Sequence, residues 1–343
     1  MSVFKSVMSN KNLKGLINNR VDNGHVNTNI MAVNLLFSGK VRGGIKKGKM
    51  SMLCAPSQLG KSLIGLSTLA SAQRDGMKCV VIDAEDSFDY ELAEQFGIKT
   101  DKNSLMVFAD SNIIDIKNFI ALISKETPVE ERHNVFVLFD SWGPLVTNVI
   151  IKKAEDGKET ADMSLPRWKN ELANILLSTK MTYFVVNHIM DAIGSFEEFA
   201  ITGGKKVYYN CSSVVLGYSK AKDKDGSDIT GAIITAKTHK SRECKEHNKL
   251  KYRIHHNGGL DPWFGLLELA LEGGFVIKPT NGWYSRPCVE DDRKWREKDI
   301  YCSEFWVPIF KNTDLETFCN DSFQFERKAK LSAAEDFAAA FNK

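Results

Sequence analysis

The chain has 343 residues, 43% of them hydrophobic and 26% charged, which is ordinary for a globular protein with a sizeable core. Its 46 basic and 43 acidic residues leave a net charge of +3, so overall charge alone indicates no particular partner. Apolar runs such as residues 135–139 are too short to span a bilayer, and the first residues lack the apolar segment of a signal peptide, which excludes a membrane or secreted protein of the usual kinds.

The seven cysteines are scattered and form no C-x-x-C pair. This pattern favours neither a zinc site nor a disulfide framework. Reduced thiols are typical of the cytoplasm, which is where we expect the protein to act.

Residues 1–25 are basic and rich in asparagine, and we expect them to form an arm that precedes the core. Four later runs are almost continuously apolar and end in a polar residue: 50–55, 78–85, 134–140 and 182–188. Such runs are typical of strands that are buried on both faces of a parallel sheet. Helical spacing of apolar residues lies between them, at 61–76 and 167–180. The alternation predicts an α/β fold with a mostly parallel central sheet.

Beyond residue 210 the pattern changes to two antiparallel strands around the turn at residues 222–228. A second change occurs at HHNGGLDP, residues 255–262, which is rich in turn residues and marks a domain boundary. We therefore expect a core domain over residues 26–256 and a small α/β domain over residues 257–343.

Residues 54–62 read CAPSQLGKS, close to the phosphate-loop pattern G-x-x-x-x-G-K-[ST], but alanine replaces the first glycine. The stretch follows a predicted strand and opens a predicted helix, as the pattern requires. At the end of a strand a small side chain matters more than the conformational freedom of glycine, so alanine is acceptable. The alternative is a helix start that binds no ligand. The candidate nucleotide-binding residues are Ala55, Pro56, Ser57, Gln58, Leu59, Gly60, Lys61 and Ser62.

In this geometry the helix N-terminus and the loop N–H groups hold phosphates, Lys61 reaches the β- and γ-phosphates, and the Ser62 hydroxyl binds Mg²⁺. Asp140 ends an apolar run at the edge of the sheet where ligands bind in open α/β folds. We expect it to support Mg²⁺ through a water molecule, and a helix-capping aspartate is the alternative.

Glu85 ends the run that follows the phosphate-loop helix, where a carboxylate can polarise a water molecule against the γ-phosphate. The same stretch contains Asp83, Asp86 and Asp89, so a solvated acidic turn is the other interpretation.

The order of APSQLGKS, DAEDSFD, LFDSWG, VVNH and AITGGKKVYY resembles the RecA family of DNA recombinases. Within that family the chain is most similar to the UvsX-type recombinases of tailed phages. The shared segments are TNIMAVNLLFSGKVRGGIKKG, THKSRE, GGLDPWFGLLELALEGGFVIKPTNGWYSR and FWVPIFK. The resemblance covers roughly residues 25–312.

The resemblance implies a P-loop ATPase core whose subunits bind ATP between neighbours in a helical filament, with an N-terminal helical arm that contacts the next subunit. It implies that Glu85 activates water and that His188 senses the γ-phosphate. It also implies that Lys240 and Arg242 reach the ATP of the neighbouring subunit. Taken without the family, His188 is a histidine at a strand end, and residues 237–253 are a basic stretch that is either solvated or faces phosphate.

Two loops would face DNA. The first, residues 148–166, is long, polar and unpatterned, and the resemblance places backbone and spacer contacts at Met163 and Arg167. The second covers residues 189–206. The resemblance assigns its phosphate contacts to Thr202, Gly203 and Gly204, and glycines allow close approach to the sugar–phosphate chain.

Charge in the second loop comes from Lys205 and Lys206. A phenylalanine, Phe196 or Phe199, would wedge between base steps, and a buried anchor of the loop is the equal alternative for either.

The function implied is ATP-dependent DNA strand exchange by a filament on single-stranded DNA, with ATP and Mg²⁺ as cofactors. The partners implied are single- and double-stranded DNA, and proteins of the single-strand-binding and mediator classes. If the chain is phage-encoded, it acts in the cytoplasm of the infected bacterium. The alternatives are a hexameric helicase motor on the same core, a mediator that does not hydrolyse ATP, and a small-molecule kinase.

Overall fold

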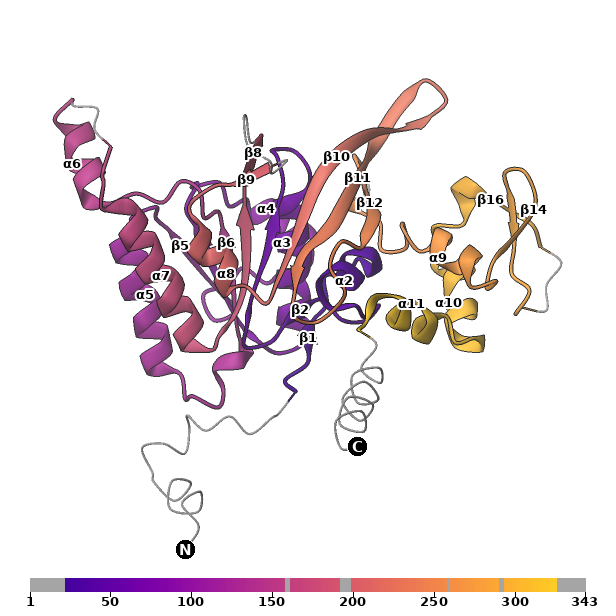
Figure 1. Ribbon diagram of the computed structural model, residues 1–343, viewed down its shortest axis with the longest axis horizontal. Helices are drawn as coiled ribbons and strands as arrows, with labels where there is room; N and C mark the ends of the chain where they lie inside the picture. Colours follow the sequence, from indigo (N-terminus) through magenta and orange to yellow (C-terminus); the bar gives the residue numbers. More distant parts are fainter. Residues whose placement is uncertain (1–21, 158–160, 192–198, 258, 290–292, 326–343) are drawn as a thin grey trace, which may run out of the picture.

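The computed structural model describes residues 22–157, 161–191, 199–257, 259–289 and 293–325. Its centre is a nine-stranded sheet in the order β13-β12-β11-β10-β3-β7-β6-β4-β5 (Figure 1). The strands are β3 (Met50–Cys54), β4 (Lys78–Asp83), β5 (Leu105–Ala109), β6 (Val135–Asp140), β7 (Thr182–Asn187), β10 (Ser213–Asp225), β11 (Asp228–Ser241), β12 (Lys249–His255) and β13 (Gly259–Leu260).

Strands β10, β3, β7, β6, β4 and β5 run parallel, and β11, β12 and β13 add an antiparallel extension. The predicted α/β fold, its four apolar strands and the antiparallel pair after residue 210 are confirmed. Three strand ends were placed too late, because β3 ends at Cys54, β4 at Asp83 and β7 at Asn187. The edge strand β5 was not predicted, although its run LMVFA is apolar at every position and is followed by Asp110, as in the four predicted strands.

The sheet separates two apolar cores. Successive residues of β6 alternate between them: Phe136 and Leu138 face one core, and Val137 and Phe139 face the other. This alternation explains why the strand is apolar at every position. Helices α2 (Met31–Ser38) and α3 (Lys61–Arg74) cover the first face, and α5 (Ile113–Glu126) and α7 (Leu165–Thr179) cover the second (Figure 1). Shorter connections contain α4 (Tyr90–Gln95), α8 (Lys205–Asn210) and the 3₁₀ turn at Arg132–Asn134.

The C-terminal part is small and mixes helices with an antiparallel sheet, as predicted. It contains α9 (Leu267–Glu272), β14 (Ile277–Thr280), β15 (Trp283–Ser285), β16 (Trp295–Arg296), the 3₁₀ turn Glu297–Asp299, α10 (Ser303–Asn312) and α11 (Leu315–Phe323). Its buried Phe305 and Trp306 belong to the same apolar cluster as helices α2 and α3. The boundary at residues 256 and 257 stays a prediction.

At the N-terminus, β1 (His25–Val26) pairs with β2 (Ile45–Lys46). Residues 1–21 of the predicted arm lie outside the described residues. Within the described part of the chain, every helix is too short or too polar to cross a membrane.

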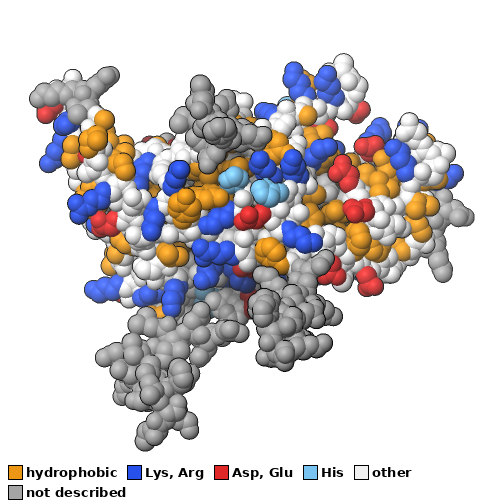
Figure 2. All heavy atoms as spheres, viewed as in Figure 1, with side chains coloured by type: hydrophobic (Ala, Val, Ile, Leu, Met, Phe, Trp, Pro, Cys, Tyr) orange, Lys and Arg blue, Asp and Glu red, His pale blue; other side chains and the backbone are white. Residues whose placement is uncertain are grey.

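Three segments project from one edge of the sheet, at the top of Figure 1: α6 (Asn148–Glu155), the β8–β9 hairpin (Ile189–Asp191 and Phe199–Ile201) and the β10–β11 hairpin. Figure 2 shows Lys and Arg side chains on the first and the last of them. The prediction of an unpatterned loop over residues 148–166 was wrong in its first half. The run NVIIKKAE is short and amphipathic, and it forms a helix with no buried residue.

Ala55, the residue that replaces the first glycine of the phosphate-loop pattern, follows directly on β3 and is fully buried. Its neighbour on β10 is Gly217. A Cβ atom at Gly217 would lie 3.3 Å from the Ala55 Cβ, and 3.5 Å from both Ile234 and the Tyr252 hydroxyl. Among the described residues, Ala55 is not one of the non-glycine positions with a positive φ angle. Alanine is therefore accommodated here because its backbone is ordinary and the facing residue has no side chain.

Gly217→Val tests this packing. The added side chain overfills the space beside Ala55, so we expect the free energy of unfolding to fall by about 1–3 kcal/mol, measured by urea denaturation. Ala55→Gly in the same background should restore part of the loss, giving a positive coupling in the double-mutant cycle. Ser219→Val, at an exposed position of the same strand, is the control, with an expected change within about 0.5 kcal/mol. Additive effects of the two changes would contradict the proposed contact.

Candidate functional site

The loop between β3 and α3 has the local geometry of an anion site. Gly60 precedes the helix with a φ angle of 77°, and Gln58 has a φ angle of 62°. The positive φ angle of Gly60 favours glycine, and a Cβ atom there would also lie 2.2 Å from Cδ1 of Ile254 and displace that side chain. No side chain caps the first turn of α3, which leaves the helix N–H groups available to a ligand.

Other loop residues hold the loop in place or face solvent. Leu59 is buried and its carbonyl oxygen accepts a hydrogen bond of 2.8 Å from the Tyr252 hydroxyl. Pro56 is half-buried, whereas Ser57 and Gln58 are exposed.

Lys61, the first residue of α3, points back into the loop. Its ammonium donates to the Pro56 carbonyl oxygen at 2.9 Å and lies 3.5 Å from Nδ1 of His188. The residue is 6% exposed. Burial lowers the pKa of the Lys61 ammonium, while the nearby carboxylates of Asp140 and Glu85 oppose this shift. The side chain is thus a buried positive charge beside two acids, placed where the phosphate-loop pattern needs it.

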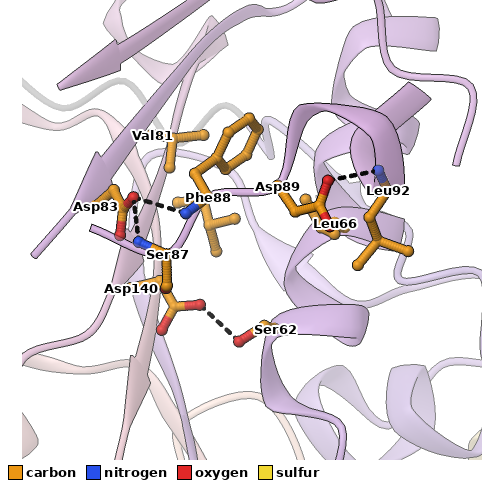
Figure 3. A pocket seen from close by; sticks show the side chains of 10 residues that line it. Ser62, Leu66, Val81, Asp83, Ser87, Phe88, Asp89, Leu92 and Asp140 are labelled. Carbon is orange, nitrogen blue, oxygen red and sulfur yellow. Dashed lines mark hydrogen bonds between the residues drawn. The ribbon is translucent and has the colours of Figure 1, made fainter. Parts of the chain in front are cut away.

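Asp140 ends β6, and its Oδ2 accepts a hydrogen bond of 2.8 Å from the Ser62 hydroxyl (Figure 3). Burial raises the pKa of Asp140, and the bond from Ser62 opposes the rise. The two predicted magnesium-site residues therefore lie in direct contact across adjacent elements.

Two acids at and after the end of β4 hold the backbone of the turn. Asp83 Oδ2 accepts the N–H groups of Ser87 and Phe88, both at 2.8 Å, and Asp89 caps α4 through the N–H of Leu92 at 3.0 Å (Figure 3). These two acids therefore shape the turn. They also line a small pocket beside the phosphate loop, formed by Ser62, Leu66, Val81, Asp83, Ser87, Phe88, Asp89, Leu92, Leu138 and Asp140.

Glu85 lies two residues beyond β4, not at its end as predicted, because β4 stops at Asp83. Its Oε1 accepts a hydrogen bond from the Ser141 hydroxyl and lies 3.2 Å from Nε2 of His188. The Glu85 side chain keeps 36% of its exposure. Glu85 is thus positioned by two neighbours and still open to solvent.

Asn187 ends the neighbouring strand β7, and His188 directly follows it. Both residues connect the site to residues 202–204. The Asn187 amide donates to the Thr202 carbonyl oxygen at 2.8 Å. The Thr202 hydroxyl lies 3.0 Å from Asn187 Oδ1 and donates to the His188 carbonyl oxygen at 2.9 Å. Through these bonds, Asn187 and His188 connect Glu85 to the Thr-Gly-Gly segment.

Gly203 and Gly204 have φ angles of 82° and 99°, a region that favours glycine. Lys205 and Lys206 begin α8 with exposed side chains. A pocket joins this segment to the start of α7, and its lining consists of Leu165, Pro166, Lys169, Asn170, Gly203, Gly204, Lys205, Lys206 and Tyr209. The two predicted DNA-facing regions therefore meet in one place.

Met163 is 90% exposed just before α7, and Arg167 is exposed in its first turn. Of the two candidate wedges, Phe196 lies outside the described residues. The backbone of Phe199 belongs to β9, but its side chain lies outside the described part of the structure.

Lys240 and Arg242 lie away from the loop residues of the same chain, beside the start of β10. The Lys240 ammonium donates to three carbonyl oxygens at the end of α8, those of Tyr208, Tyr209 and Cys211, at 2.8–2.9 Å. Burial lowers the pKa of Lys240. Arg242 is exposed, with a long contact of 3.5 Å to the Tyr209 carbonyl oxygen.

Ser141, Trp142 and Lys169 contact the site and were not predicted from the sequence. Ser141 directly follows Asp140 in LFDSWG, and that adjacency was an available signal. The sequence contains no signal that marks Lys169, because a lysine within an amphipathic helix is normally exposed. In the structure this lysine is only 7% exposed.

Known protein families match nearly all of the part of the chain that the structure describes. The family model of the RecA N-terminal domain matches residues 17–261. The model of the C-terminal domain of the bacteriophage T4 recombination and repair protein matches residues 263–320. The recombination and repair protein of Enterobacteria phage T4 is 29% identical over 311 residues, which are 87% of this chain and 78% of that protein.

Protein RecA of Chlorobium chlorochromatii is 26% identical over 249 residues, which are 71% of this chain and 68% of that protein. Because the RecA N-terminal model spans well over half of the chain and agrees with the sheet described above, the chain belongs to the RecA family.

Proposed function

We propose that the protein is an ATP-dependent recombinase that forms filaments on single-stranded DNA and exchanges strands with a homologous duplex. Recombination and repair are the processes in the name of the phage T4 relative, and we propose them here together with recombination-dependent replication. The observation that carries the proposal is the set of contacts at the end of β7. There, His188 faces Glu85 and Lys61, while Asn187 holds Thr202 of the Thr-Gly-Gly segment.

The phosphate loop fits a nucleotide with Mg²⁺. Ser62 supplies a hydroxyl and Asp140 a carboxylate, and magnesium commonly takes one or two carboxylates together with substrate phosphates. Among the described residues, no three His, Cys, Asp or Glu side chains form a metal cluster of their own, so the phosphates of ATP would complete the site. When bound, Mg²⁺ neutralises charge on the transferred phosphate.

The hydrogen-bond chain from Lys61 to Glu85 supports hydrolysis. If the Lys61 ammonium donates to Nδ1 of His188, the ring carries its proton on Nε2 and donates it to Glu85. Glu85 is then held as a carboxylate that accepts bonds and can take a proton from an attacking water molecule. A phosphate entering the loop competes for the Lys61 ammonium, so nucleotide binding changes the partners of His188.

The second wall of the site would come from the next subunit. Lys240 and Arg242 lie apart from Lys61 within one chain, as a role across a subunit interface requires. Their bonds to α8 place them next to the helix that follows the Thr-Gly-Gly segment. DNA and the neighbouring nucleotide would thus act on the same short helix.

DNA contacts would be made mainly to the backbone. Gly203 and Gly204 offer N–H groups at close range, and Lys205, Lys206 and Arg167 offer exposed charge. Met163 is exposed as a spacer, and either Phe196 or Phe199 would stack between bases. Sequence is then recognised by base pairing, and the protein needs no base-specific contacts.

The test is to measure ATP hydrolysis with and without single-stranded DNA and to image the same samples. We expect DNA to stimulate hydrolysis and filaments to form on the DNA. Hexameric rings would instead select a helicase motor. If DNA does not stimulate hydrolysis and no filaments form, the proposal is rejected. A mediator or a kinase would then remain as the alternative.

Glu85→Gln isolates the chemical step. The amide oxygen still accepts the Ser141 hydroxyl, but the general base is lost, so hydrolysis should fall by about 10²–10⁴-fold. Nucleotide binding and filament formation should persist, because neither uses the charge of Glu85. Asp89→Asn removes a carboxylate charge from the same turn and should leave turnover within about twofold, since Asp89 caps α4. Near-normal hydrolysis by Glu85→Gln would refute the assignment.

A further inference from the structure

The segment Ser141–Gly143, directly after Asp140, contacts three separate parts of the protein. The Ser141 hydroxyl donates to Glu85. The indole N–H of Trp142 donates to the Gly203 carbonyl oxygen at 3.0 Å. The carbonyl oxygens of Gly143 and Trp142 accept from the ammonium of Lys169, at 2.9 and 3.5 Å. We call this segment the linker strand end. It joins the side chain of Glu85 to the Thr-Gly-Gly segment and to α7.

Trp142 leaves little freedom at its contact with Gly203. The side chain is fully buried and packs against Phe139, with ring centroids 5.3 Å apart. A Cβ atom at Gly203 would lie 2.5 Å from Cδ1 of the indole ring. The glycine backbone therefore rests directly on the ring. A shift of Gly203 must move Trp142 or break the hydrogen bond, because close-packed interiors have no slack to absorb it.

Lys169 fixes the other side of the linker strand end. Its ammonium is buried within α7 and hydrogen-bonds to carbonyl oxygens, which offsets the free energy of removing a charge from water. Burial also lowers the pKa of this ammonium. The same helix begins two residues after the exposed Met163 and carries Arg167 in its first turn. Lys169 thus connects the first DNA-facing region to Trp142 and Gly143 of the linker strand end.

We propose that Trp142 and Lys169 are positioning residues that transmit DNA binding to Glu85 through the linker strand end. DNA held by the Thr-Gly-Gly segment and by the start of α7 would fix Gly203 and Lys169. Both then fix the segment whose Ser141 orients the Glu85 carboxylate. Energetic coupling of this kind travels through packed side chains and hydrogen bonds. The inference rests on the proposed DNA-stimulated hydrolysis. The route through the linker strand end is separate from the contacts that Asn187 and His188 make at the end of β7.

Two substitutions remove the donors while keeping the packing. Trp142→Phe deletes the indole N–H but keeps an aromatic ring, and Lys169→Met deletes the ammonium but keeps the stem. We expect each to reduce the stimulation of hydrolysis by single-stranded DNA about fivefold, the size of one hydrogen bond. Hydrolysis without DNA should stay within twofold of the parent, since neither residue contacts the nucleotide site directly.

Matched controls come from α7, which contains Trp168, and from α5, which contains Lys117. Trp168→Phe and Lys117→Met alter a neighbouring pair, in which the Lys117 ammonium lies 4.8 Å from the Trp168 ring, outside the linker strand end. Both controls should be stimulated as strongly as the parent. The readouts are turnover without DNA, maximal turnover with DNA, and the DNA concentration that gives half the effect.

A loss of maximal stimulation with unchanged DNA-free turnover supports the inference, because a folding defect would lower both. Test variants stimulated as strongly as the controls would overturn it while leaving the proposed function intact. An equal loss with and without DNA in both test variants would also overturn it, as that marks a structural role. A parent protein that DNA does not stimulate would reject the proposed function and the inference together.

Discussion

Parallel pairing of β3, β7, β6 and β4 is the constraint on which the rest of the structure depends. Strands buried on both faces must be apolar throughout, so polar side chains are confined to their ends. Parallel direction then brings those ends to one edge. Glu85, Asp140 and His188 therefore lie at or just beyond the ends of three neighbouring strands. Ser62 of α3 hydrogen-bonds to Asp140 at the same edge.

Burial at this edge makes the charges interdependent. Lys61 is a buried cation whose pKa is lowered by burial, and Asp140 is a mostly buried acid whose pKa is raised by it. Each is stabilised by the other, so a phosphate that takes up the Lys61 ammonium changes the surroundings of Asp140 and His188 together. This dependence is the physical basis for a site that responds to the state of its nucleotide.

Much of this was predictable from sequence because it rests on local pattern. The phosphate loop, Asp140 and the four buried strands follow from apolar runs that end in characteristic residues. The edge strand β5 was missed although its run LMVFA is apolar throughout, so its signal was present in the sequence. The helix α6 was missed because it is short, partly polar and has no buried residue. Lys169 was missed for another reason: only the three-dimensional structure shows that this lysine is buried.

Other features depend on what lies beyond one chain. The proposed roles of Lys240 and Arg242 require a neighbouring subunit. Within this chain Lys240 instead holds the end of α8, which sequence alone did not indicate. The contact between Gly217 and Ala55 likewise could not be predicted from the sequence. It explains why Ala55 fits, but the two residues are 162 positions apart and become neighbours only through the pairing of β10 with β3.

The most direct test of coupling between the two halves of the site is the affinity for single-stranded DNA measured with a non-hydrolysable ATP analogue and with ADP. The account predicts tighter DNA binding with the analogue. By thermodynamic linkage, DNA must then tighten binding of the analogue over ADP by the same factor. Equal DNA affinities in the two nucleotide states would contradict it, because the end of β7 would then connect two sites that do not influence each other.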